Sequence, residues 1–158
     1  MTLLATDPEI MPEEEAETLS SMSDPTHSAV QGNLLVELSR HADLRVYPEL
    51  DLRLLGNDSR PDLCLYRREP LNLRADEPRR EDPPPVAIEV LSAKQGLSEL
   101  LRRVEGCLAA GVKSCWIVVP PLRTVTIFSQ DGAEKSWHEG VITDPAIGVT
   151  ADLATVFS

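Results

Sequence analysis

Apolar residues recur at every fourth position early in the chain, which is the spacing of one face of an α-helix. Asp24 can accept hydrogen bonds as an N-cap, and Pro25 suits the first helical position. The pattern therefore predicts a helix of about four turns that ends near Arg40 and carries His27 in its first turn. Its apolar stripe consists of Val30, Leu34 and Leu38.

The next segment alternates between apolar and polar residues, which is typical of a half-buried strand. Residues 44–55 follow this pattern, and Pro48 favours an edge position because proline has no N–H to donate. The polar residues 56–59 predict a turn, and the apolar residues 62–66 predict a second strand. Together these segments predict a β-hairpin.

Residues 67–85 differ in character, because arginine, acidic residues and proline dominate them and few of them could enter a core. A connection of nineteen residues is longer than most that join adjacent elements. The segment therefore predicts a functional loop or a flexible insert.

A buried strand, a helix and a second buried strand follow in order. Residues 86–91 and 116–119 are nearly continuous in apolar residues, with Glu89 as the exception. Between them an apolar stripe at helical spacing covers residues 97–108, and Gly111 suits the position after a helix end. This order predicts a βαβ unit, whose two strands are parallel and joined in the right-handed sense.

The carboxyl-terminal part adds further short strands. Residues 123–129 alternate and are expected to pair with 116–119, and Asp131-Gly132 predicts a turn into a return strand at 137–141. The whole pattern predicts an α/β fold with a mixed sheet of about five or six strands flanked by two helices. We expect this domain to span residues 24–158.

Length and charge refine this picture. The chain has 158 residues and a net charge of −11, and an aromatic share of 4% argues against a stacking surface for single-stranded nucleic acid. Residues 1–25 contain seven acidic residues and no lysine or arginine, so we expect residues 1–23 to form a disordered acidic arm. The charge excludes a protein that coats nucleic acid through bulk positive charge, but it leaves room for a local basic groove.

Cysteine usage and the lack of a long apolar run bear on location. The three cysteines form no CxxC pair, which argues against a disulfide scaffold and a zinc knuckle and fits a reducing compartment. The first residues lack the pattern of a signal peptide, and the longest apolar run, 115–121, is too short to cross a bilayer. We therefore expect a cytoplasmic protein with no membrane segment.

Two acidic residues are candidates for chemistry. Asp62 begins a strand, and Glu89 lies inside the most apolar strand, where an unpaired carboxylate is costly to ionise. If the two strands are neighbours, both carboxylates can hold a hard divalent ion such as Mg²⁺, which activates water and stabilises charge on a phosphodiester. The alternative is structural, with Glu89 facing solvent or pairing with an arginine.

Several motifs occur in a characteristic order, and His27 stands at the start of the first helix. They are RPDL at 60–63, PPVAIEVLS at 84–92, AGV at 110–112 and CWIV at 115–118. In this order they resemble the Uma-two family of bacterial restriction-endonuclease-like proteins, over residues 24–157. The resemblance implies a nuclease fold of the PD-(D/E)xK type, with Asp62 and Glu89 as ligands of Mg²⁺ or Mn²⁺. It also makes Glu49 either a third ligand or a solvent-facing acid, and His27 either a residue bordering the cleft or a polar residue of the first turn.

The sequence departs from the superfamily pattern around its lysine. The position two residues after the second acid holds Leu91, and the family's lysine on the following helix corresponds to Arg103. Arginine keeps the positive charge but, with a pKa above ~12, cannot act as a base. Arg103 could stabilise an oxyanion or pair with Glu99 one turn earlier, and Lys94 could substitute for the lysine. Two further departures are Cys107 in place of a tyrosine and Val119 in place of an aspartate.

These features predict an endonuclease that depends on Mg²⁺ or Mn²⁺ and acts on DNA, with arginines of residues 67–80 and Arg102 along the phosphate path. The alternative is a catalytically impaired nuclease-fold module that binds or regulates, and the altered lysine positions favour it. In both cases we expect a homo-oligomer, most simply a homodimer. A third hypothesis makes the acidic arm a mimic of DNA in a regulatory partner protein.

Overall fold

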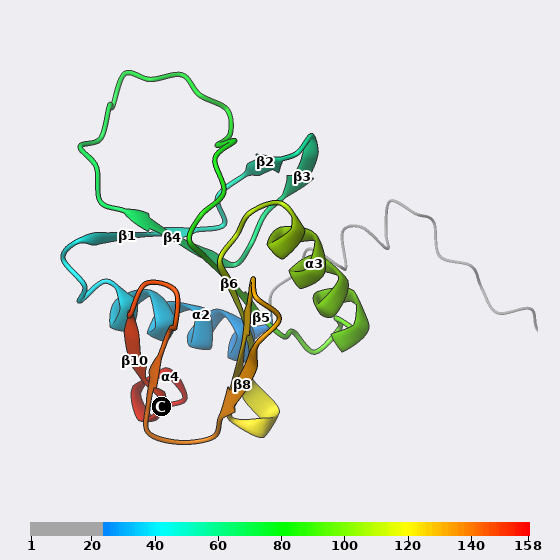
Figure 1. Ribbon diagram of the computed structural model, residues 1–158. Helices are drawn as coiled ribbons and strands as arrows, with labels where there is room; N and C mark the ends of the chain where they lie inside the picture. Colours follow the sequence, from blue (N-terminus) through cyan, green and yellow to red (C-terminus); the bar gives the residue numbers. More distant parts are fainter. Residues whose placement is uncertain (1–23) are drawn as a thin grey trace, which may run out of the picture.

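A mixed six-stranded sheet forms the centre of the molecule, as the computed structural model of residues 24–158 shows (Figure 1). The strand order is β1-β4-β5-β6-β7-β8, and all neighbouring pairs are antiparallel except β5 and β6. The strands are β1 (Leu44–Pro48), β4 (Leu63–Arg67), β5 (Val86–Val90), β6 (Ser114–Val119), β7 (Thr124–Ser129) and β8 (Glu134–Trp137). The parallel βαβ pair and the edge position of the strand containing Pro48 are both confirmed. The predicted acidic arm, residues 1–23, lies outside the described residues.

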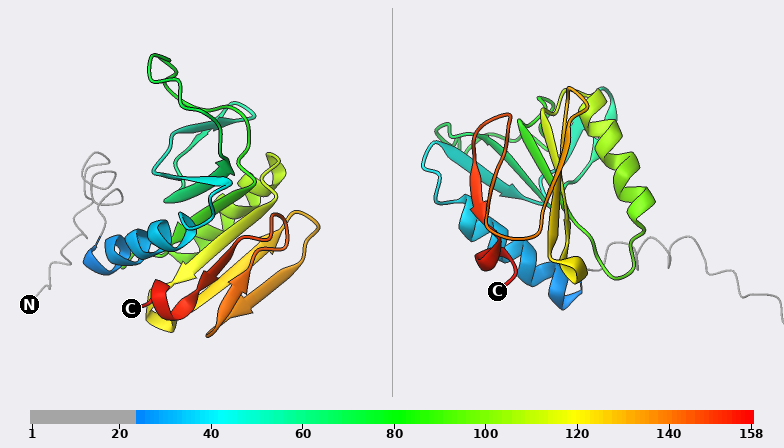
Figure 2. Two further views of the ribbon diagram at one scale, coloured as in Figure 1. Left: turned by 90° about the vertical axis from the view of Figure 1, so that its left-hand side faces the viewer. Right: turned by 60° about the horizontal axis from the view of Figure 1, so that its bottom comes forward.

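Two helices cover opposite faces of this sheet (Figure 2). They are α2 (Pro25–Leu38) and α3 (Leu97–Ala109). A short hairpin of β9 (Val141–Thr143) and β10 (Thr150–Asp152) joins α2 on its face, together with a third, short helix α4 (Leu153–Val156). The predicted mixed α/β class is therefore confirmed, with α4 added to the two expected helices. None of the helices found in residues 24–158 is long and apolar enough to cross a bilayer.

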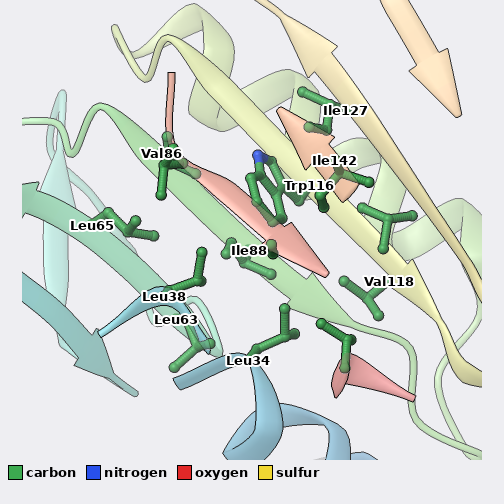
Figure 3. Packing of buried hydrophobic residues seen from close by; sticks show 14 of the residues in the cluster. Leu34, Leu38, Leu63, Leu65, Val86, Ile88, Trp116, Val118, Ile127 and Ile142 are labelled. Atoms are coloured by element: carbon green, nitrogen blue, oxygen red, sulfur yellow. The ribbon is translucent and has the colours of Figure 1, made fainter. Parts of the chain in front are cut away.

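Alternating side chains divide the core between the two faces. On the α2 face, Leu63 of β4 and Ile88 of β5 pack with Trp116 and with Leu34 of the helix (Figure 3). The residues that alternate with these along each strand point to the opposite face of the sheet. Cys64, Ala87 and Cys115 therefore pack on the α3 face. Each strand therefore contributes to both layers, which explains why β5 is almost continuously apolar.

The start of α2 follows the predicted pattern. Pro25 occupies the first turn, and the Asp24 carboxylate accepts a hydrogen bond from the backbone N–H of His27 at 2.8 Å. The second oxygen of Asp24 accepts a hydrogen bond from the backbone N–H of Ala93 at 2.8 Å. One side chain therefore caps the helix and also ties it to the loop that follows β5.

The long strand predicted over residues 44–55 is interrupted. Glu49 adopts a left-handed conformation with φ of 49°, which turns the chain away after β1. Strands β2 (Leu52–Leu54) and β3 (Asn57–Ser59) then form a separate hairpin with its turn at Leu55-Gly56. Apolar and polar residues alternate through both segments, so the hydrophobic pattern did not indicate the change in chain direction between them.

The return strand predicted at 137–141 begins earlier. The backbone N–H of Ser129 donates to the carbonyl of Ala133, so the turn at Asp131-Gly132 is tight and pairing resumes at Glu134. Residues 141–143 instead form β9, which pairs with β10.

The polar segment predicted as a loop, residues 67–85, arches away from the sheet beyond Arg67 (Figure 1). Its later part is anchored at Arg80, whose backbone N–H donates to the carbonyl of Asp51 and whose carbonyl accepts from Arg53. The Arg80 guanidinium lies 3.6 Å from the centre of the Tyr66 ring and forms an ion pair with Asp82 at 2.7 Å. The loop is thereby bound to the β2–β3 hairpin as well as to β4.

Candidate functional site

The two predicted acidic residues lie on neighbouring strands, at matched positions. β4 and β5 are antiparallel and pair Leu63 with Ile88, so the next pair outward is Asp62 and Glu89. Both residues share the parity of Cys64 and Ala87, whose side chains pack on the α3 face. Directly opposed residues of an antiparallel pair have Cβ atoms about 4.5–5.5 Å apart. The fold therefore brings together two carboxylates that are far apart in the sequence.

Hydrogen bonds fix the position of Asp62. Its Oδ2 atom accepts a hydrogen bond from the backbone N–H of Val90 at 2.7 Å and lies 3.1 Å from Nε2 of His27. Its carbonyl accepts from the backbone N–H of Glu49 at 3.0 Å and from the side-chain amide of Gln31 at 3.2 Å. Groups from α2, from β5 and from the residue after β1 thus hold Asp62 at the start of β4.

Glu89 is the more buried acid of the pair, with 7% of its surface exposed. Its Oε1 atom lies 2.9 Å from a guanidinium nitrogen of Arg103, which also donates to the carbonyl of Arg60 at 3.2 Å. Burial raises the pKa of Glu89 well above its usual value despite the attraction of Arg103, and the nearby carboxylate of Asp62 raises it further. Arg103 therefore pairs with Glu89 across to the sheet, in place of Glu99 on its own helix.

His27 reaches the same site from the first turn of α2. It is 5% exposed, and its hydrogen bond with Asp62 raises the pKa of the imidazole. Its other ring nitrogen, Nδ1, has no hydrogen-bond partner among residues 24–158. His27 consequently contacts Asp62 of the acidic pair, but it is not among the residues that line the cleft described below.

Glu49 and Lys94 stand apart from the pair. The Glu49 side chain is exposed and lines a hollow against α2 with Ser28 and Gln31. Lys94 is exposed in the turn before α3, and within the described chain no hydrogen bond or ion pair joins it to either carboxylate. In the part of the chain that the structure describes, no three His, Cys, Asp or Glu side chains converge as a metal-binding group.

A cleft of about 460 Å³ opens beside Glu89 and is lined by residues of the β2–β3 hairpin and of α3. Its lining combines charged side chains, among them Glu89, Arg103 and Arg60, with apolar ones. The full lining comprises Leu54, Asn57, Asp58, Ser59, Arg60, Glu89, Arg103, Gly106, Cys107 and Ala110. The cleft gives solutes access to Glu89 from the α3 face.

The arginines near this cleft are largely paired with acids. Asp58 binds Arg53 at 2.8 Å and Arg79 at 2.7 Å, and these two cations lower the pKa of Asp58 to about 2. Arg60 binds Asp51 at 2.7 Å. A phosphate group could replace either exposed carboxylate, since an arginine presents the same fork of donors to both.

The three cysteines differ in their surroundings. Cys64 is fully buried, as expected for a core residue, and burial raises the pKa of its thiol to about 12. Cys107 lines the cleft, and interaction with the Cys115 thiol together with the charge of Arg103 lowers its pKa. All three are free thiols.

Sequence reasoning missed the most buried carboxylate of the described chain, Asp144, which is 0% exposed. Its oxygens accept hydrogen bonds from the indole N–H of Trp116 at 2.7 Å and from the hydroxyl of Ser114 at 3.2 Å. Backbone N–H groups of Ala146 and Ile147 complete its shell. The only signal for Asp144 in the sequence is a polar residue followed by Pro145 after the end of β9, and this pattern predicts a turn equally well.

The donor set suits a hard divalent cation. Asp62 and Glu89 supply carboxylate oxygens from opposed positions, and the Asp62 carboxylate adds to the larger effect of burial in raising the pKa of Glu89. A cation between them would offset the repulsion between the two carboxylates. Mg²⁺ is commonly held by one or two carboxylates and keeps several water molecules, so two acids are sufficient.

Comparison with known proteins identifies a family and solved structures that match the fold. The model of the Uma2 family, described as "Putative restriction endonuclease", matches residues 7–153. The crystal structure of a putative nuclease belonging to DUF820 from Anabaena variabilis has a TM-score of 0.75 and 20% identity, covering 86% of this chain and 82% of that one. A cryo-EM structure of a DrdV–DNA complex has a TM-score of 0.46 and 16% identity, covering 91% of this chain but 11% of that one. No curated protein matches the sequence significantly.

Proposed function

The chain belongs to the Uma2 family of putative restriction endonucleases, and on that basis we propose that it is a metal-dependent endonuclease that hydrolyses phosphodiester bonds of DNA. One observation carries the proposal: Asp62 and Glu89 occupy opposed positions on adjacent strands, beside a cleft large enough to admit a nucleotide. The fold, which is similar to that of the putative nuclease from Anabaena variabilis, is consistent with it.

Asp62 and Glu89 would hold Mg²⁺ or Mn²⁺. When bound, the cation would lower the pKa of a coordinated water and neutralise charge on the phosphate. The chain supplies the positioning: the N–H of Val90 and the imidazole of His27 hold one oxygen of Asp62, which sets the orientation of this carboxylate.

Arg103 supplies the positive charge that the family's lysine would carry, but it cannot act as a base. Its guanidinium holds Glu89 at 2.9 Å, and donors that this contact leaves free can bind a phosphate oxygen in the cleft. Because arginine stays protonated, it stabilises negative charge and does not take a proton from water. Lys94 has no contact with the acidic pair, and we assign it no role.

The test compares wild type with Glu89→Gln in nicking of supercoiled plasmid with Mg²⁺ or Mn²⁺, and in calorimetry with each metal alone. Glu105→Gln is the matched control, because Glu105 is exposed on α3 and the charge change is the same. We expect nicking and metal binding by wild type and by the control, and loss of both in Glu89→Gln. Equal metal binding by all three proteins would refute the site.

The same assay judges the non-catalytic alternative. Leu91 and Arg103 at the two lysine positions favour a protein that binds DNA without cutting it. DNA binding by wild type together with a complete lack of nicking would support that alternative. The homodimer stays a prediction, and light scattering of the purified chain tests it.

A further inference from the structure

One glycine in the wall of the cleft has no conformational or packing role that explains its identity. Gly106 lies inside α3, where glycine costs about 1 kcal/mol relative to alanine. Its backbone has no left-handed conformation, and a Cβ atom built on it would meet no atom within 4 Å. Neither backbone geometry nor packing of the described chain requires a glycine at this position.

The position of Gly106 suggests why a side chain is absent. It lies one turn after Arg103 and lines the same cleft as Glu89. Glycine allows a ligand to approach a backbone closely, and a larger residue here would project into the cleft. By contrast, Gly111 beyond the helix end has a φ of 104° and a conformational reason for being glycine.

The cleft is lined by both charged and apolar residues. Glu89, Arg103 and Arg60 contribute charge, whereas Leu54 and Ala110 are apolar. A nucleotide likewise combines a charged phosphate with a largely apolar sugar and base. The volume, about 460 Å³, lies in the range of about 300–1,000 Å³ typical of small-ligand sites.

We propose that Gly106 leaves room for the nucleoside next to the scissile phosphate, whose sugar and base lie against the backbone of α3. The proposal rests on the proposed function, because it assigns the phosphate to a place beside Glu89 and Arg103. A base inside an intact duplex is stacked and paired, so it must leave the stack to enter the cleft. The preferred substrate is therefore a strand with an unpaired nucleotide at the cleavage position.

The test uses Gly106→Ala and Gly106→Leu, with Gly32→Ala as the matched control. Gly32 is also a helix-interior glycine with open space at Cβ, but it lies on α2 outside the cleft. Thermal unfolding should show that Gly106→Ala and Gly32→Ala are at least as stable as wild type, since alanine is the better helix former. Affinity for a fluorescein-labelled oligonucleotide, single-stranded and duplex, is measured by anisotropy without metal.

We expect wild type to bind the single strand more tightly than the duplex. Gly106→Leu should weaken binding of the single strand about tenfold, which corresponds to about 1.4 kcal/mol. Gly106→Ala should fall between Gly106→Leu and wild type, and Gly32→Ala should match wild type. Unchanged affinity in both Gly106 variants, with wild type binding and cutting DNA, overturns this inference alone. A wild type that binds no DNA overturns the proposed function as well.

Discussion

Removing the carboxylate of Asp62 should weaken the fold as well as the chemistry, and two substitutions separate these effects. In Asp62→Ala the buried N–H of Val90 loses its acceptor, and His27 loses its partner. An unsatisfied buried donor costs about 1–3 kcal/mol, and the lost bond to His27 adds about 1 kcal/mol. We therefore expect a decrease of about 2–4 kcal/mol in the free energy of unfolding.

Asp62→Asn should cost less, about 1 kcal/mol, because an amide oxygen can still accept from Val90 but without the negative charge. Both variants should lose metal binding, so the Asp62→Asn substitution removes the ligand while keeping most of the stability. Urea unfolding followed by the fluorescence of buried Trp116 measures the difference. Asp51→Ala is the control, because it breaks an exposed ion pair with Arg60 that should contribute little.

The outcome that counts against this reasoning is specific. If Asp62→Ala unfolds at the urea concentration of wild type, the bond to Val90 does not stabilise the fold. If Asp62→Asn binds Mg²⁺ or Mn²⁺ as wild type does, Asp62 is a structural residue only.

Two further predictions concern other parts of the molecule. Asp144→Ala should lower the free energy of unfolding by about 3–5 kcal/mol, measured in urea titrations. The reason is that Trp116, Ser114 and two backbone N–H groups all lose the carboxylate that accepts their hydrogen bonds. A decrease below ~1 kcal/mol would contradict this prediction. Cys107 should react with iodoacetamide at lower pH than an ordinary thiol, because the thiolate is the reactive form and the pKa of Cys107 is lowered. Cys107 also lines the cleft, whereas Cys64 is buried with a raised pKa and should resist the reagent. Peptide mass spectrometry across a pH series measures both, and equal labelling of the two would contradict the assignment.

Much of the fold follows from patterns in the chain. The spacing of apolar residues located α2 and α3, and the strand–helix–strand order predicted the parallel pair β5–β6. The interruption at Glu49 escaped prediction, because a left-handed residue changes the direction of the chain without changing the alternation of side chains. The hairpin β2–β3 was missed for the same reason.

The candidate site was predictable in part. Asp62 was singled out by its place at the start of a strand, and Glu89 because a carboxylate in an apolar strand needs compensation. Their opposed placement depends on the β4–β5 register. The partners of these acids depend on three-dimensional contacts. Arg103 could pair with Glu99 by spacing alone, and only the packing of α3 on the sheet directs it to Glu89. Gly106 gave no signal, because a helix glycine has meaning only once the space beside it is known.

Arg80 connects the loop of residues 67–85 to one wall of the cleft, and this connection has a consequence for how such proteins diversify. The β2–β3 hairpin is one wall of the cleft and a separate two-stranded sheet, and backbone hydrogen bonds tie its first strand to Arg80. Insertions or deletions between residues 68 and 79 would shift this wall while leaving Asp62 and Glu89 untouched. Relatives that differ only in loop length would therefore present clefts of different shape beside the same pair of carboxylates.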